Sequence, residues 1–120
     1  MASRILIVED NELNLKLFCD LLRAHNFEVE PVRDGRGMLE RAQNFMPELI
    51  IMDIQLPHVS GLELITQLKK TERLCHIPVM AVTAYAAPED EQKIRQAGAT
   101  SYIAKPISVI RFLEAVKALI

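Results

Sequence analysis

The sequence of 120 residues is poor in cysteine and has no long apolar run. Its two cysteines, Cys19 and Cys75, lie far apart without a CxxC motif, which favours reduced thiols. No stretch approaches the roughly 20 apolar residues that span a bilayer, and the first residues lack the apolar region of a signal peptide. We therefore expect a cytoplasmic protein without membrane insertion.

The sequence also lacks a basic excess. Its 14 Lys and Arg residues face 16 Asp and Glu residues, the formal net charge is -2, and the basic residues form no stripe. Nucleic-acid binding depends on neutralising phosphates, so we expect no direct nucleic-acid partner. No GxGxxG motif follows a predicted strand, which weighs against a dinucleotide site. The three histidines share no metal-ligand spacing.

The composition is typical of one globular domain. Half of the residues are hydrophobic and a quarter are charged, and no linker, repeat or low-complexity tract interrupts the chain. We expect a single domain over residues 1–120 with no output domain.

Apolar runs alternate with helical patterns along the whole chain. The runs predict strands at residues 5–8, 29–32, 49–52, 77–82 and 101–103. Asn11 is a candidate cap for the first helix, and Pro88 is typical of the first turn of the fourth. The apolar faces of the five predicted helices contain Leu13, Leu17, Phe18, Leu21, Leu22; Met38, Leu39, Ala42, Phe45; Leu62, Ile65, Leu68; Ile94, Ala97; and Val109, Phe112, Leu113, Val116.

Strict alternation of strands and helices predicts an α/β fold, a doubly wound three-layer sandwich around a parallel sheet. In such sheets, ligand sites lie beyond the carboxyl ends of the strands. The polar residues at those ends are Glu9 and Asp10, Asp53, Thr83 and Lys105. Each alone has a bland explanation, such as a helix cap for Thr83 or a solvated side chain for Lys105.

Together these residues form a chemical set. Oxygen ligands from Asp10 and Asp53, with Glu9 acting through water, suit Mg²⁺, which pairs readily with phosphate. The Asp53 carboxylate can attack phosphorus to form an acyl phosphate if nearby positive charge offsets its own. Lys105 would supply a charge and Thr83 a hydrogen-bond donor to the phosphoryl oxygens. An ionised carboxylate needs no general base, so a missing catalytic histidine is expected.

Five segments carry a resemblance to a known family. They are residues 5–11 (ILIVEDN), 49–57 (LIIMDIQLP), 60–61 (SG), 78–84 (PVMAVTA) and 105–106 (KP). They resemble the signature segments of response-regulator receiver domains, in the family's order and over the whole chain. Residues 8–14, 52–57 and 105–109 further resemble a single-domain regulator of the bacterial cell cycle.

The resemblance implies a flavodoxin-like (βα)5 fold with strand order 2-1-3-4-5. It implies that Asp53 is the phosphoacceptor and that Mg²⁺ binds Glu9, Asp10, Asp53 and the backbone carbonyl of Gln55. It also implies a cis peptide bond before Pro106, a feature of only about 5–6% of X-Pro bonds in folded proteins. The protein would be a signalling phosphoacceptor that assists its own phosphorylation and dephosphorylation, and would not be an enzyme acting on other substrates.

The same resemblance implies a switch and partners. Phosphorylation would draw Thr83 inward, and Tyr102 would turn into the vacated space, although a half-buried tyrosine with a wet hydroxyl fits the sequence equally well. A sensor histidine kinase or histidine phosphotransferase would donate the phosphoryl group near the first helix. A downstream protein would bind the face formed by the fourth helix, fifth strand and fifth helix, in cell-cycle or cell-division signalling.

Tyr85 could restrict attacking water and prolong the lifetime of the acyl phosphate, or could simply pack in its loop.

The main alternative is an aspartyl-phosphate phosphatase of the haloacid dehalogenase type. That enzyme needs a second acid two residues after the nucleophile, where this chain has Gln55. A calcium loop starting at Asp10 fails because its sixth and twelfth positions would be Leu15 and Leu21. A flavodoxin-like FMN module would have to bind phosphate at the acidic segment 9–12. An interaction domain without phosphotransfer would not need all five functional residues.

Overall fold

A computed structural model describes residues 3–84 and 87–120, in which strands and helices alternate along the chain. The strands are β1 (Arg4–Val8), β2 (Glu28–Val32), β3 (Leu49–Asp53), β4 (Val79–Thr83) and β5 (Ser101–Ala104). The helices are α1 (Glu12–Ala24), α2 (Met38–Phe45), α3 (Gly61–Lys70), α4 (Pro88–Ala97) and α5 (Val109–Leu119).

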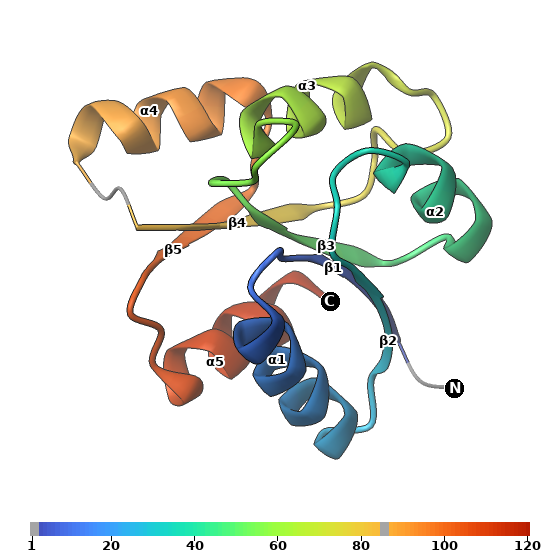
Figure 1. Ribbon diagram of the computed structural model, residues 1–120, viewed down its shortest axis with the longest axis vertical. Coiled ribbons are helices and arrows are strands. Elements are labelled where there is room, and N and C mark those ends of the chain that lie inside the picture. The colour runs from blue at the N-terminus through green and yellow to red at the C-terminus, as the bar shows by residue number, and fades with distance from the viewer. Residues whose placement is uncertain (1–2, 85–86) are drawn as a thin grey trace.

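The strands form one parallel sheet in the order β2-β1-β3-β4-β5. Helices α1 and α5 cover one face of this sheet, and α2, α3 and α4 cover the other (Figure 1). The predicted doubly wound three-layer fold and the strand order implied by the resemblance are therefore both confirmed. Because all strands run in the same direction, their carboxyl ends meet at one edge of the sheet.

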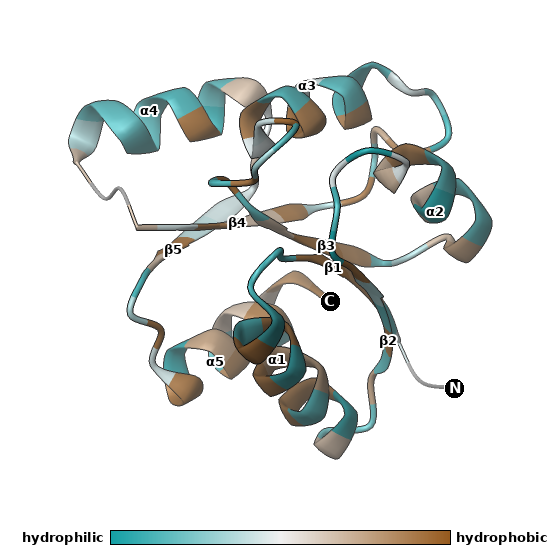
Figure 2. Ribbon diagram, viewed as in Figure 1, coloured by the Kyte–Doolittle hydropathy of each residue, from teal (hydrophilic) through white to brown (hydrophobic). Residues whose placement is uncertain are grey.

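The core has two parts because successive strand residues face opposite sides of the sheet. Leu6 and Val8 pack toward α2, α3 and α4, whereas Ile5 and Ile7 pack toward α1 and α5. On the second side, the rings of Phe18 and Phe112 stack with centroids 5.0 Å apart and join the two helices. The central strands β1 and β3 are largely hydrophobic and α4 is largely hydrophilic (Figure 2).

Local signals set several helix ends. The Asn11 side chain accepts a hydrogen bond from the Asn14 N–H at 3.0 Å, which confirms the predicted cap of α1. Ser60 caps α3 in the same way, and Pro88 is the first residue of α4. Gly98 follows α4 with φ 122°, a conformation that favours glycine.

Strand β4 differs from its predicted range of 77–82. Ile77 is buried, but its N–H donates to the Leu74 carbonyl in the preceding turn. Pro78 has no N–H, so regular pairing begins at Val79. The strand then continues to Thr83, one residue beyond the prediction.

Two of the predicted apolar residues of α1 lie outside the core. Phe18 is buried, whereas Leu13 is 80% exposed and Leu17 is 53% exposed. The prediction that Leu13 and Leu17 belong to the apolar, core-facing side of this helix is therefore wrong. None of the helices in residues 3–84 and 87–120 is long and apolar enough to cross a bilayer.

Candidate functional site

The predicted polar residues converge at the carboxyl edge of the sheet. Glu9 and Asp10 directly follow β1, Asp53 ends β3, and Thr83 ends β4. Strands β1, β3 and β4 are adjacent in the sheet, so their ends are neighbours. Lys105 follows β5 and reaches the same place with a long side chain.

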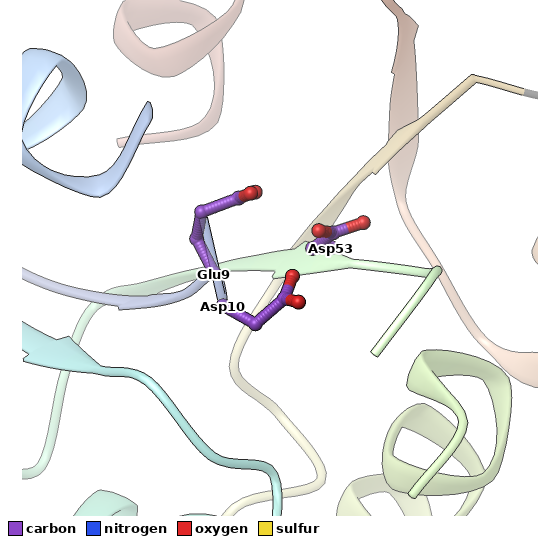
Figure 3. Close-up of side chains that lie close together, drawn as sticks. All are labelled: Glu9, Asp10 and Asp53. Atoms are coloured by element: carbon purple, nitrogen blue, oxygen red, sulfur yellow. The ribbon is translucent and has the colours of Figure 1, made fainter. Parts of the chain in front are cut away.

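Three carboxylates form a compact cluster at this edge. Each of Glu9, Asp10 and Asp53 offers a carboxylate oxygen within 4.8 Å of the others. Figure 3 shows Glu9 and Asp10 at the end of β1 beside Asp53 at the end of β3. Glu9 and Asp53 are only 1% and 2% exposed, while Asp10 faces solvent. Three carboxylates this close repel one another, and a bound cation would offset this repulsion.

The pKa of Glu9 reflects this crowding. The pKa of Glu9 is raised from 4.5 to about 7, mainly by burial and also by the negative charge of Asp53. Lys105 and a hydrogen bond from the Asn11 N–H act in the opposite direction. Lys105 and the Asn11 N–H therefore do not fully offset the effects of burial and of Asp53 on Glu9.

Lys105 is the nearest positive charge to the acids. Its Nζ lies 3.5 Å from Asp53 Oδ2 and 3.8 Å from Glu9 Oε1. The following peptide bond, Lys105–Pro106, is cis, as the resemblance implied. The Lys105 side chain is partly exposed, so it can contact both the buried acids and an incoming ligand.

The two oxygens of Asp53 have different surroundings. Oδ1 accepts a hydrogen bond from the Gln55 N–H at 2.9 Å, whereas Oδ2 faces Lys105. The backbone that carries Asp53 is closely packed against the start of α3. A Cβ on Gly61 would collide with the Asp53 carbonyl oxygen and lie 2.7 Å from Ile54 Cα. Glycine at this position lets α3 begin directly against the end of β3.

The side chain of Gln55 joins the loops after β3 and β4. Its Nε2 donates to Thr83 Oγ1 at 2.8 Å, and its Oε1 accepts from the Ala84 N–H at 3.1 Å. Thr83 is fully buried at the end of β4. From the sequence, Gln55 was expected to contribute only its backbone carbonyl to the site. The side-chain contact was missed because it joins residues 28 positions apart along the chain.

Tyr102 lies away from the acid cluster, next to α4. It is partly buried, and the Arg95 guanidinium carbon lies 5.7 Å from its ring centroid. Arg95 also pairs with Glu91 at 2.9 Å. A hydrogen bond with Glu91 raises the pKa of Tyr102 above its ordinary value. Tyr102 is therefore held by two residues of α4.

The structure thus brings Glu9, Asp10, Asp53, Thr83 and Lys105 to one edge of the sheet. Tyr102, on β5, lies beside α4 instead. Tyr85 lies outside the described residues. The donors in the cluster are carboxylate oxygens without sulfur or imidazole, which is the chemistry that Mg²⁺ and other hard cations prefer. An acidic cluster that can bind a metal, beside a lysine and a hydroxyl, is equipped to bind a phosphoryl group.

Comparisons with known proteins agree with this chemistry. The chain is 54% identical over 118 residues to the polar-differentiation response regulator DivK of Brucella ovis, covering 98% of this chain and 96% of the relative. The chemotaxis protein CheY4 of Vibrio cholerae superposes with a TM-score of 0.94 at 25% identity, with both chains fully covered.

A third relative was solved with a metal. The receiver domain of the sensor histidine kinase PA1611 from Pseudomonas aeruginosa has a magnesium ion coordinated in its active-site cleft. It superposes with a TM-score of 0.90 at 28% identity, covering 99% of this chain and 98% of that domain. The family model for the response regulator receiver domain matches residues 5–117. The chain therefore belongs to the response regulator receiver domain family, the signalling domains of two-component pathways.

Proposed function

We propose that this protein accepts a phosphoryl group on Asp53 in the presence of Mg²⁺ and thereby switches a surface that controls partner proteins. The observation that carries the proposal is the placement of Lys105 Nζ 3.5 Å from a buried aspartate within a cluster of three acids. A buried carboxylate beside a fixed cation is suited to covalent phosphoryl transfer.

The two oxygens of Asp53 would have different roles in the transfer. Oδ1 is held by the Gln55 N–H, so Oδ2 is the attacking oxygen. Attack by Oδ2 forms an O–P bond while the P–N bond to the donor's phosphohistidine breaks, and the electron pair of that bond stays with the imidazole. Lys105 and Thr83 would then bind the phosphoryl oxygens at the ends of neighbouring strands.

The acidic residues would hold the metal. Asp10, Asp53 and the backbone carbonyl of Gln55 would be ligands, with Glu9 acting through water. When bound, Mg²⁺ would supply positive charge that offsets the acids and the phosphoryl group. The oxygen-only donor set and the magnesium ion in the related PA1611 domain support this choice.

The switch would run from Thr83 to Tyr102. A phosphoryl group brings close to two negative charges and strong acceptors, which would draw Thr83 and its loop toward Asp53. Tyr102 would leave its contacts with Glu91 and Arg95 and turn inward, which changes the face formed by α4, β5 and α5. A shift from 1:99 to 99:1 needs about 5.5 kcal/mol, within reach of several charge-assisted hydrogen bonds.

The phosphoryl donor would be a sensor histidine kinase or a histidine phosphotransferase that docks on α1 and the start of α5. A hollow of about 250 Å³ lies between these helices, and its lining includes Leu17, Val109 and Lys105. Leu17 and Val109 expose apolar surface there, and Leu13, one turn before Leu17 on α1, is exposed as well. Because Lys105 also contacts Asp53, a partner seated here would present its histidine at the phosphoacceptor.

The biological setting would be control of the cell cycle or cell division. The support is the 54% identity to a regulator named for polar differentiation. A phosphatase of the haloacid dehalogenase type is not favoured, because Gln55 stands where that enzyme needs an acid. The Gln55 side chain is in any case engaged with Thr83 and Ala84.

Incubation with acetyl phosphate and Mg²⁺ tests the proposal. We expect the wild-type protein to gain a phosphoryl group that hydroxylamine removes, and Asp53→Asn to gain none. Asp20→Asn, which changes an exposed aspartate of α1, is the matched control and should behave like wild type. An Asp53→Asn protein that still gains a hydroxylamine-sensitive phosphoryl group would contradict the proposal.

A further inference from the structure

The Gln55 side chain makes two hydrogen bonds that the phosphoacceptor reaction does not explain. Its Oε1 accepts from the Ala84 N–H, and its Nε2 donates to Thr83 Oγ1. We call this pair of bonds the Gln55 bridge. Since the Ala84 N–H can only donate, it fixes which end of the amide is oxygen, and the amino end must then face Thr83.

The Gln55 bridge spans the two loops on either side of the phosphoryl position. Gln55 lies two residues after Asp53, and its own N–H holds Asp53 Oδ1. Thr83 and Ala84 follow Val82, whose carbonyl accepts from the Ile54 N–H at 3.0 Å. The bridge therefore ties the loop after β4 to the loop that carries the end of the phosphoacceptor strand.

The groups that the bridge engages are those a phosphoryl group on Asp53 would need. A phosphoryl group offers only acceptor oxygens, so it must recruit donors from the end of the adjacent strand. The Ala84 N–H is one such donor, and it is occupied by Gln55 Oε1 in the unmodified protein. The Thr83 hydroxyl oxygen is held at 2.8 Å by Gln55 Nε2, which fixes its resting position.

We propose that Gln55 is a positioning residue that holds Thr83 and Ala84 in the resting state and competes with the phosphoryl group for them. This inference rests on the proposed function of Asp53. We call the effect of Gln55 a brake, because it opposes the change to the phosphorylated state. Breaking the bridge costs part of the free energy gained when the loop closes on the phosphoryl group. Removing the Gln55 amide should therefore favour the switched state.

Beryllofluoride with Mg²⁺, a non-covalent mimic of a phosphoryl group on aspartate, provides the test. Gln55→Met keeps the side-chain length but cannot form the bridge. A net hydrogen bond is worth about 0.5–1.5 kcal/mol, so we expect the variant to bind beryllofluoride about 3- to 10-fold more tightly than wild type in an NMR titration. Gln43→Met, at an exposed glutamine of α2, should bind like wild type.

A second readout is independent of phosphoryl chemistry. In the metal-free, unmodified protein, Gln55→Met should speed hydrogen exchange of the Ala84 amide and leave the Val82 amide unchanged. Gln55→Asn keeps the amide but is one methylene shorter, so it should act like Gln55→Met. An unchanged Ala84 amide would overturn the bridge as a hold on the loop, whatever the protein binds.

The outcomes separate the brake from the proposed function. If wild type binds beryllofluoride and Gln55→Met binds equally or more weakly, the brake is wrong and the role of Asp53 stands. Weaker binding would mean that the amide supports the phosphoryl group. If wild type fails to bind at all, the proposed function itself is wrong.

Discussion

At the scale of single residues, the ionised form of Glu9 is destabilised by its surroundings in the folded protein. Glu9 is 1% exposed and lies beside the Asp53 carboxylate, and burial together with the charge of Asp53 raises its pKa from 4.5 to about 7. Between these pH values the folded protein binds more protons at Glu9 than the unfolded chain does. The contribution of Glu9 to stability is therefore greatest below pH 4.5 and is lost as the pH rises through about 7.

This sign gives a prediction for the metal-free protein. Glu9→Gln removes the buried charge, so it should be more stable than wild type at pH 8, by about 2–3 kcal/mol. The difference should shrink toward pH 5. Urea unfolding in the presence of a chelator measures it, with Glu114→Gln at an exposed position of α5 as the control. A difference that is the same at both pH values would contradict this explanation.

The identity of the site residues was more accessible to prediction than their mutual contacts. Glu9, Asp10, Asp53 and Thr83 follow or end apolar runs, and parallel strands bring such residues to one edge. The Gln55 bridge could not be predicted, because an amide two residues after a strand has many possible partners. Its choice depends on the path of the loop after β4.

At the scale of elements, the start of α3 supports the end of β3, which carries Asp53. The Gly61 N–H donates to the Ile54 carbonyl at 3.1 Å, and the missing side chain allows the helix to approach Asp53. The position of Asp53 therefore depends on how closely α3 packs against the end of β3.

Two glycine substitutions test this support. Gly61→Ala places a Cβ against backbone atoms of Asp53 and Ile54, which cannot yield without moving the strand end. We expect it to lower the free energy of unfolding by about 2–3 kcal/mol and to slow phosphorylation of Asp53 by acetyl phosphate. In Gly35→Ala the nearest atom, at 2.8 Å, is the flexible tip of Leu64, so the cost should be about 1 kcal/mol or less. Equal losses in thermal or urea unfolding would contradict the close-packing argument.

Element boundaries show where pattern reasoning stops. The apolar residue Ile77 extended the predicted fourth strand, although its N–H is used by the turn before it. Leu13 and Leu17 fit the helical period of α1 but lie beside its buried stripe. Periodicity alone does not separate a residue that faces the core from one that faces a partner.

At the scale of the whole molecule, the site and an apolar surface share one edge. The hollow between α1 and the start of α5 is lined by Lys105, which also contacts Asp53. The alternation of strands and helices was enough to predict three layers. The order of the strands was not contained in that alternation and came from the resemblance, since several orders satisfy right-handed crossovers.

The shared edge predicts a partner-specific defect. Leu17→Glu places a charge in the hollow, so phosphotransfer from the fastest histidine kinase or phosphotransferase donor should fall about 10-fold or more, a loss of roughly 1.4 kcal/mol. Phosphorylation by acetyl phosphate should be unchanged, because that small donor needs no docking surface. Ile120→Glu changes an exposed apolar residue at the opposite end of α5 and is the control. Equal loss with both donors would place the defect in the site.

The most direct test of the whole account is to locate the phosphoryl group chemically. Borohydride reduces an acyl phosphate on aspartate to homoserine, which peptide mass spectrometry can assign to one position. After treatment with acetyl phosphate and Mg²⁺, we predict homoserine at position 53 and its loss when a chelator is present. Homoserine at another aspartate, or equal labelling without a divalent metal, would contradict the assignment of Asp53 as a metal-assisted phosphoacceptor.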